Sequence, residues 1–224
     1  LGGRHTLRFL KPNDRYGQFA LHAASWKPHT HEFANTTGGW DNDIFATNCA
    51  GCHTTAVETE IQAFAAPSLD CFTCHGDTPQ GHQNEPTLAI FAKDARMDPR
   101  VEMSICGSCH LRGGTSRSSG LPYPNQFIPG DNLFKDFEVD LGPDAIAGMN
   151  PGDAHIFQNV RDVLIAGQTG LTCVSCHDIH GESTRKHRVL RRLERAEYCA
   201  ICHDNADEYT SIIQYERHSE VCRY

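Results

Sequence analysis

Five copies of one short pattern, Cys-x-x-Cys-His, constrain how this 224-residue chain can fold. The residues between the two cysteines vary, but a histidine directly follows every second cysteine. Together the copies use ten of the eleven cysteines. We call them the first to fifth motifs; they are Cys49, Cys52 and His53; Cys71, Cys74 and His75; Cys106, Cys109 and His110; Cys173, Cys176 and His177; and Cys199, Cys202 and His203. We expect the chain to fold around whatever these side chains bind.

The spacing suits the covalent attachment of haem. Two thiols add to the two vinyl groups of one haem and form thioethers, and two intervening residues let both cysteines reach one porphyrin edge. The histidine that follows lies beneath the ring and supplies an imidazole to the iron. We therefore predict five haem c cofactors. In each, the two cysteines of a motif form the thioethers and the motif histidine is the proximal iron ligand.

Zinc is the competing interpretation of the same cysteines. The eighteen residues between Cys52 and Cys71 fit the spacing of a four-cysteine zinc ribbon. Five cysteine pairs, however, cannot be divided evenly among four-cysteine sites, and zinc leaves the five motif histidines without a role. A disulfide framework explains less, because Cys-x-x-Cys pairs are poor long-range cross-links. Haem attachment is the favoured interpretation.

The predicted haem content bounds the fold class. With 224 residues divided among five motifs, each haem has about 45 residues of protein. Hydrophobic residues make up only 39% of the chain, and the mean hydropathy is −0.48. Such a chain buries little without its cofactors, so folding is expected to depend on haem. We predict a mostly irregular fold in which short α-helices wrap around a chain of five covalently bound haems, with little β structure.

The chain is expected to be one multihaem domain, 1–224, with a three-haem part (1–112), a loop-rich connection (113–152) and a two-haem part (153–224). Residues 111–132 are rich in Gly, Ser and Pro and predict irregular backbone that packs over haem faces. A strand is expected near residues 4–10. Helices are expected over 153–167, with Asp153 as N-cap and Gly167 as the stop, over 183–203 and over 204–218.

The second axial ligand of each iron decides the chemistry. A second histidine gives a saturated, low-potential electron carrier, whereas methionine raises the potential. Nine histidines lie outside the motifs, but the chain has only three methionines, which are expected to fill core gaps. We therefore predict bis-histidine iron. The candidate distal ligands are His82, His155, His180, His187, His218 and His5.

Charge and hydropathy exclude some partners and suggest a compartment. The formal net charge is −8, which argues against nucleic-acid binding. There is no apolar run long enough to span a membrane. The chain starts at Leu1 without Met, as expected of a mature form whose signal peptide has been removed. Since thioethers form after export, an extracellular or periplasmic location is predicted. Cys222 remains unassigned.

Three segments carry a family resemblance: CHTT from Cys52, CFTCHGD from Cys71 and CVSCHDIHG from Cys173. They resemble segments of multihaem c-type cytochromes, namely the tetrahaem electron carriers of nitrifying bacteria and the doubled-CXXCH cytochromes. The resemblance implies haems in alternating parallel and perpendicular pairs. Such relatives carry a further motif near the N-terminus, and its absence before Cys49 leaves the ligation of the first haem open, with His5 or His22 as candidates. The composition also resembles that of extracellular cytochrome filaments.

Two functions follow from these observations. The first is electron transfer through five closely spaced bis-histidine haems, by an exported carrier or by a conductive filament subunit for extracellular electron transfer. Its partners would be redox proteins, extracellular acceptors or further copies of the chain. The alternative is a multihaem oxidoreductase that acts on a small nitrogen compound. Pentahaem nitrite reductases use a Cys-x-x-Cys-Lys motif, which this chain lacks, so a non-enzymatic role is favoured.

Overall fold

The computed structural model describes residues 6–76, 81, 84, 98–165, 167, 172–177 and 179. The chain divides into two compact units. Unit 1 comprises Leu1–Met97 and Arg112–Val139, and unit 2 comprises Asp98–Leu111 and Asp140–Tyr224. The division into a three-haem part, a connection and a two-haem part stays a prediction.

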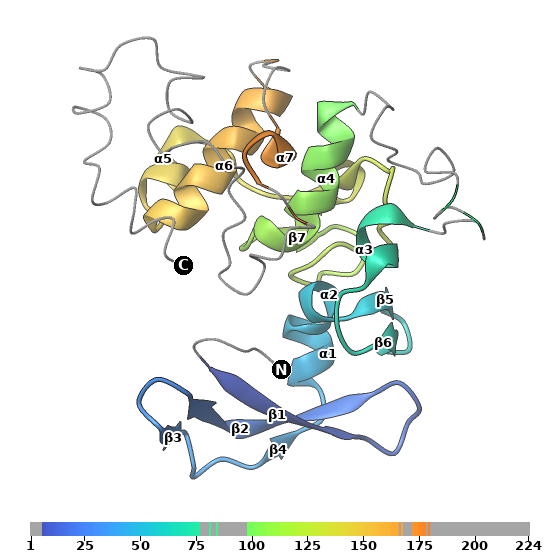
Figure 1. Ribbon diagram of the computed structural model, residues 1–224, viewed down its shortest axis with the longest axis vertical. Helices are drawn as coiled ribbons and strands as arrows, with labels where there is room; N and C mark the ends of the chain where they lie inside the picture. Colours follow the sequence, from blue (N-terminus) through green and yellow to red (C-terminus); the bar gives the residue numbers. More distant parts are fainter. Residues whose placement is uncertain are drawn as a thin grey trace. The chain divides into compact units, whose positions relative to one another are not determined.

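Unit 1 begins with an antiparallel sheet (Figure 1). Its strands are β1 (Leu7–Pro12), β2 (Phe19–Lys27), β3 (Glu32–Ala34) and β4 (Trp40–Asp41). The central strand, β2, pairs with each of the other three. It holds the buried residues of the sheet, whereas β3 and β4 are mainly exposed. The strand expected near residues 4–10 corresponds to β1.

An aromatic core joins this sheet to the elements that follow it in unit 1. These elements are α1 (Ile44–Asn48), α2 (Ala50–His53), β5 (Thr55–Glu58), β6 (Ala63–Ala66) and α3 (Cys71–His75). Leu21, Phe45, Ala50 and Phe64 form one buried cluster. The rings of Phe45 and Phe64 meet edge to face, with centroids 5.6 Å apart, a geometry that aromatic pairs prefer. This core positions the first motif, because Ala50 lies within it.

Most of residues 111–132 form turns, bends or other irregular backbone, as predicted. The exception is β7 (Thr115–Ser116), which pairs with β8 (Phe137–Glu138) after the short helix η2 (Leu133–Lys135). Asp136 accepts hydrogen bonds from the Ser116 hydroxyl (2.5 Å) and the Ser118 N–H (3.0 Å). These bonds hold the pKa of Asp136 below its ordinary value. The irregular segment is therefore fixed by its own polar contacts.

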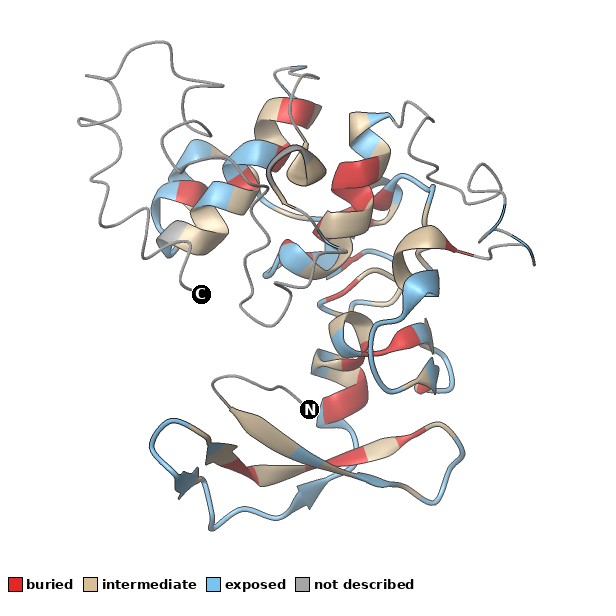
Figure 2. Cartoon of the chain, viewed as in Figure 1, coloured by how far each residue is buried: buried red, intermediate tan, exposed pale blue. Residues whose placement is uncertain are grey.

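Unit 2 is helical. Its helices are α4 (Pro99–His110), α5 (Pro143–Ala147), α6 (Pro151–Leu164) and α7 (Cys173–Cys176). α4 packs against α6 and α7, and α5 packs against α6. Met103 from α4 and Phe157, Val160 and Val163 from α6 are buried, and Figure 2 shows buried positions on both helices. The predicted apolar face of the helix within 153–167 is confirmed at Val160 and Val163.

The start of α6 corrects one prediction. Asn150, not Asp153, is the N-cap, and its side-chain oxygen accepts the N–H groups of Gly152 and Asp153, each at 3.1 Å. Pro151 occupies the first helical position, where its missing N–H and fixed φ are favourable. Asp153 instead lies in the first turn. Gly167, just past the end of the helix, has φ +69°, which suits the predicted stop.

The fold class agrees with the prediction only in part. Helices are short and much of the backbone is irregular, but the expectation of little β structure is not confirmed, since six strands lie within residues 7–66. The helices predicted over 183–203 and 204–218 lie outside the described residues. Among the described residues, no helix combines the length and apolar character needed to cross a bilayer.

Candidate haem attachment sites

Each described motif forms a short helical turn. The first motif makes up α2 with Cys49 as the N-cap, the second makes up α3, the third ends α4, and the fourth forms α7 with His177 following. Residues three positions apart share one face of a helix, so the two cysteines of each of the first three motifs project together. The His177 N–H bonds to the Cys173 carbonyl at 2.8 Å, which continues the turn into the histidine. The fifth motif, Cys199, Cys202 and His203, lies outside the described residues.

The chemistry of the side chains fits haem c. The seven cysteines whose side chains are described form no disulfide, as thioether formation requires. They are Cys49, Cys52, Cys71, Cys74, Cys106, Cys109 and Cys173. His53 and His110 are exposed, and His75 and His177 are half-buried. Burial, with a contribution from nearby His110, lowers the pKa of His177 and so favours the neutral imidazole that binds iron.

A tyrosine from the loop-rich segment supports the first motif. Tyr123 is 3% exposed, and its hydroxyl donates a hydrogen bond to the Ala46 carbonyl. A Cβ atom at Gly51, inside the motif, would lie 2.1 Å from Cγ of Tyr123. Only glycine fits there, so packing against Tyr123 determines which residue occupies this position between the two cysteines. Burial raises the pKa of Tyr123 to about 12, with smaller contributions from Cys52 and Cys49.

Two threonines follow the first motif and play different roles. The Thr54 hydroxyl donates to the Ala50 carbonyl at 2.6 Å, within the turn of the first motif. The Thr55 hydroxyl donates to the Ser68 carbonyl at 2.6 Å, thirteen residues along the chain. Thr54 therefore closes its own helix, whereas Thr55 reaches toward the second motif.

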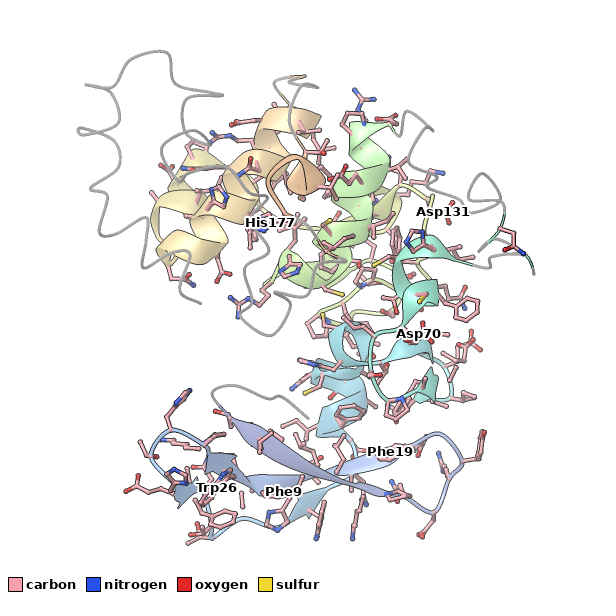
Figure 3. The ribbon with its side chains drawn as sticks, viewed as in Figure 1. Phe9, Phe19, Trp26, Asp70, Asp131 and His177 are labelled. Atoms are coloured by element: carbon pink, nitrogen blue, oxygen red, sulfur yellow. The ribbon has the colours of Figure 1, made fainter. Side chains whose placement is uncertain are left out.

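Thr55 also contacts the helix of the second motif. Its hydroxyl oxygen accepts the Asp70 N–H at 3.2 Å and lies 3.0 Å from the Thr73 hydroxyl. Asp70, labelled in Figure 3, caps this helix by accepting the Phe72 N–H at 2.9 Å. At 5% exposure Thr55 is buried, and a hydroxyl offers one donor and two acceptor positions. Thr55 uses all three and ties the first two motifs together.

The helix of the second motif is capped at both ends. Asp70 and Thr73 form a capping box at its start. Gly76, with φ +63°, ends it, in a backbone conformation that glycine adopts without strain. The Nδ1 atom of His75 is buried, and the role of this histidine as a proximal ligand stays a prediction.

In unit 2 the third and fourth motifs converge, although their first cysteines are 67 residues apart. The Sγ atoms of Cys106 and Cys173 and a carboxylate oxygen of Glu102 all lie within 4.8 Å of one another. Cys173 Sγ also lies 3.7 Å from Sδ of Met103. A hydrogen bond from Cys106 lowers the pKa of the Cys173 thiol, against the opposing effects of burial and Glu102. A thioether has no such proton, so this applies only before attachment.

Most of the predicted distal ligands lie outside the described residues: His82, His180, His187, His218 and His5. His155 is described and is exposed on α6, with its ring nitrogens 3.4 and 3.5 Å from Nδ2 of Asn159. Its ligand role stays a prediction. His22 is less suited than the sequence suggests, because its Nδ1 accepts the Ala24 N–H at 3.0 Å. In the neutral ring that bond places the proton on Nε2.

Sequence reasoning missed three residues that position motifs. Glu102 lies one helical turn before Cys106, a spacing that could have indicated a shared face. Thr55 belongs to the CHTT segment, but no role was inferred for its hydroxyl. Tyr123 lies 71 residues beyond Cys52, and no local pattern links the two.

Comparison with known proteins agrees with these motifs. The family model described as "Doubled CXXCH motif" matches residues 166–208, which contain the fourth and fifth motifs. No match was found among the curated proteins.

Two solved structures are similar in fold. One is the crystal structure of the outer cell wall cytochrome OcwA, with 20% identity and a TM-score of 0.54, covering 91% of this chain and 54% of that one. The other is an undecaheme cytochrome from the S-layer of Carboxydothermus ferrireducens, with 16% identity and a TM-score of 0.41, covering 88% and 35%. The chain thus spans about half the length of the first.

Proposed function

We propose that this chain, a multihaem c-type cytochrome, transfers electrons through five covalently bound haems. The observation that carries the proposal is the five-fold motif itself, and the four copies within the described residues form helical turns. When bound, haem iron supplies a one-electron couple. The protein then contributes the spacing, the ligands and the electrostatic surroundings of each iron.

The residues that would hold the haems follow from the motifs. The thioethers would be formed by Cys49, Cys52, Cys71, Cys74, Cys106, Cys109, Cys173, Cys176, Cys199 and Cys202. The proximal iron ligands would be His53, His75, His110, His177 and His203. The distal ligands would be drawn from His82, His155, His180, His187, His218 and His5. Bis-histidine ligation leaves no open position for a substrate, which favours a carrier over an enzyme.

Export to the periplasm or cell exterior is part of the proposal. The similar cytochrome OcwA is described as an outer cell wall protein, which supports an extracellular role without identifying the donor or acceptor. The partners would be redox proteins or extracellular acceptors, and the composition also suits assembly into a conductive filament. Electron microscopy of the secreted protein tests that last point: filaments support it, and single particles at all concentrations contradict it.

Intact mass and spectroscopy test the main proposal. The secreted protein is expected to exceed the 24.9 kDa polypeptide by five haems and to show the α-band of reduced haem c. Its ferric form is expected to be low-spin and not to bind carbon monoxide on reduction. A protein at the bare polypeptide mass contradicts haem attachment. A full haem complement with a high-spin signal instead supports an enzyme.

His155 is the distal candidate that the structure describes. His155→Gly is expected to convert one haem to a high-spin form and leave the haem count unchanged. Gln158→Ala, at another exposed position of α6, is the matched control and is expected to change neither. A fully low-spin spectrum in His155→Gly contradicts the assignment of this residue.

A further inference from the structure

Glu102 is a buried carboxylate for which electron transfer as proposed above requires no role. It is 5% exposed and lies in the first turn of α4, four residues before Cys106. Acidic side chains are rarely buried unless something compensates them. The ion pairs among the described residues do not include Glu102. The contacts that accompany its burial are therefore of another kind.

The contacts of Glu102 connect two motifs. One carboxylate oxygen accepts the Val174 N–H at 2.8 Å, and Val174 is the residue after the first cysteine of the fourth motif. The carboxylate also lies within 4.8 Å of Sγ of both Cys106 and Cys173. These sulfurs belong to different motifs. Glu102 thus stands where the third and fourth motifs meet.

Once haem is attached to both motifs, the charge of the Glu102 carboxylate would act on two haems. Each sulfur, once in a thioether, is joined to its porphyrin through a single carbon. With haem attached at both motifs, the carboxylate would lie beside the attachment edges of two different haems. A negative charge stabilises ferric haem over ferrous haem, and it does so more strongly in a buried site than in water.

We propose that Glu102 is a shared tuning residue that lowers the reduction potentials of the haems of the third and fourth motifs together. By accepting the Val174 N–H it also holds the helical turn of the fourth motif. The inference rests on the proposed attachment of haem to these motifs. It makes this pair of haems a low-potential segment whose two members respond to one side chain.

Glu102→Gln is the decisive variant, because it removes the charge and keeps both the shape and an oxygen that can accept the Val174 N–H. Two of the five couples are expected to shift to higher potential by about tenfold in the reduction equilibrium constant, about 59 mV for a one-electron couple. The measurement is a redox titration of the holoprotein, followed by optical absorbance and by electron paramagnetic resonance. Intact mass on the same samples counts the haems.

Two further variants serve as controls for this result. Glu102→Asp retains the charge and is expected to keep both couples within twofold of the parent. Asp144→Asn removes an exposed charge from α5 in the same unit, and solvent screening is expected to leave every couple within twofold. If Glu102→Gln with five haems leaves all couples within twofold, the tuning role is wrong. The same holds if only one couple moves, or if Glu102→Asp shifts both couples as far as Gln does.

The haem count separates this inference from the function on which it rests. If the parent protein carries no haem, the proposed function fails before any variant is compared. If the parent carries five haems and Glu102→Gln carries fewer, Glu102 is a positioning residue for attachment and the tuning inference fails alone. Five haems in both proteins with two raised couples support the inference.

Discussion

The two units hold their haem motifs in different ways. In unit 1, Thr55 and Asp70, which lie outside the motifs, contact Phe72 and Thr73 of the second motif rather than its cysteines or its histidine. In unit 2, the third and fourth motifs meet through the sulfurs of Cys106 and Cys173, with Glu102 beside them. In unit 1 the supporting contacts thus do not involve the atoms that attach haem. In unit 2 they do.

This difference matters for how each haem pair responds to change. Where side chains outside the motifs set the geometry, one haem can be lost and the neighbouring motif retains its support. Where the attachment atoms themselves form the contact, loss of one haem changes the surroundings of the other. The first pair is therefore expected to behave as two nearly independent sites and the second pair as one coupled site.

Removal of single haems gives the largest expected effect. Cys173→Ala with Cys176→Ala is expected to remove one haem and also to shift the potential of the third-motif haem, because Cys106 loses its neighbouring thioether. Cys71→Ala with Cys74→Ala is expected to remove one haem and leave the first-motif haem within twofold in its reduction equilibrium. Intact mass and redox titration measure both. Equal disturbance of the remaining haem in the two variants contradicts the comparison.

Gly51 tests whether aromatic packing sets the first motif. Gly51→Ala places a methyl group against the Tyr123 ring, where the closest atom is 2.1 Å away, and overpacking of this kind costs about 1–3 kcal/mol. We expect a lower unfolding midpoint in denaturant. Gly39→Ala is the matched control, since nothing lies within 4 Å of its Cβ position. Equal midpoints for the two variants mean that Tyr123 does not constrain the motif.

The Thr55 bridge can be broken without altering side-chain shape. Thr55→Val removes a buried hydroxyl that makes three contacts and leaves the Asp70 N–H with only its long 3.4 Å contact to the Thr73 hydroxyl. An unsatisfied buried group costs about 1–3 kcal/mol, so the free energy of unfolding of unit 1 is expected to fall by about that amount. Thr54→Val, which loses one bond within a helix, is expected to cost less. A larger loss for Thr54→Val contradicts the assigned roles.

The sequence predicted the haem attachment motifs better than it predicted the helices and strands that carry them. The motifs could be recognised because thioether attachment requires a fixed local spacing, and each described copy is a helical turn. The helix within 153–167 was predicted because its apolar residues repeat at helical intervals, although its N-cap was misplaced by three residues. The β strands of residues 7–66 were largely missed, since β2 buries adjacent residues such as Ala20 and Leu21 and shows no clear alternation.

Contacts between distant residues were beyond the reach of local patterns. Cys106 and Cys173 are 67 residues apart, and nothing in either motif indicates the other. Tyr123 lies in a segment whose composition predicts only irregular backbone with turns, yet its ring packs against Gly51 of the first motif. Such pairings depend on how helices and loops pack in three dimensions.

The Tyr123 hydroxyl gives the smallest effect and separates its hydrogen bond from its packing. Tyr123→Phe keeps the ring against Gly51 but removes the donor to the Ala46 carbonyl, which is expected to cost about 1 kcal/mol at neutral pH. Chemical denaturation of the holoprotein measures this difference against the parent.

The pH dependence of that difference has a defined sign. The pKa of Tyr123 is raised to about 12 in the folded protein, against about 10 in the unfolded chain. Between these values the folded state binds the proton more tightly, so the parent loses stability as the pH rises. Thioether formation removes the Cys49 and Cys52 contributions to this shift, and burial, the largest cause, remains. The stability advantage of the parent over Tyr123→Phe should therefore shrink from pH 10 to 12. An advantage that stays constant over this range would mean that the Tyr123 phenol is hydrated in the holoprotein.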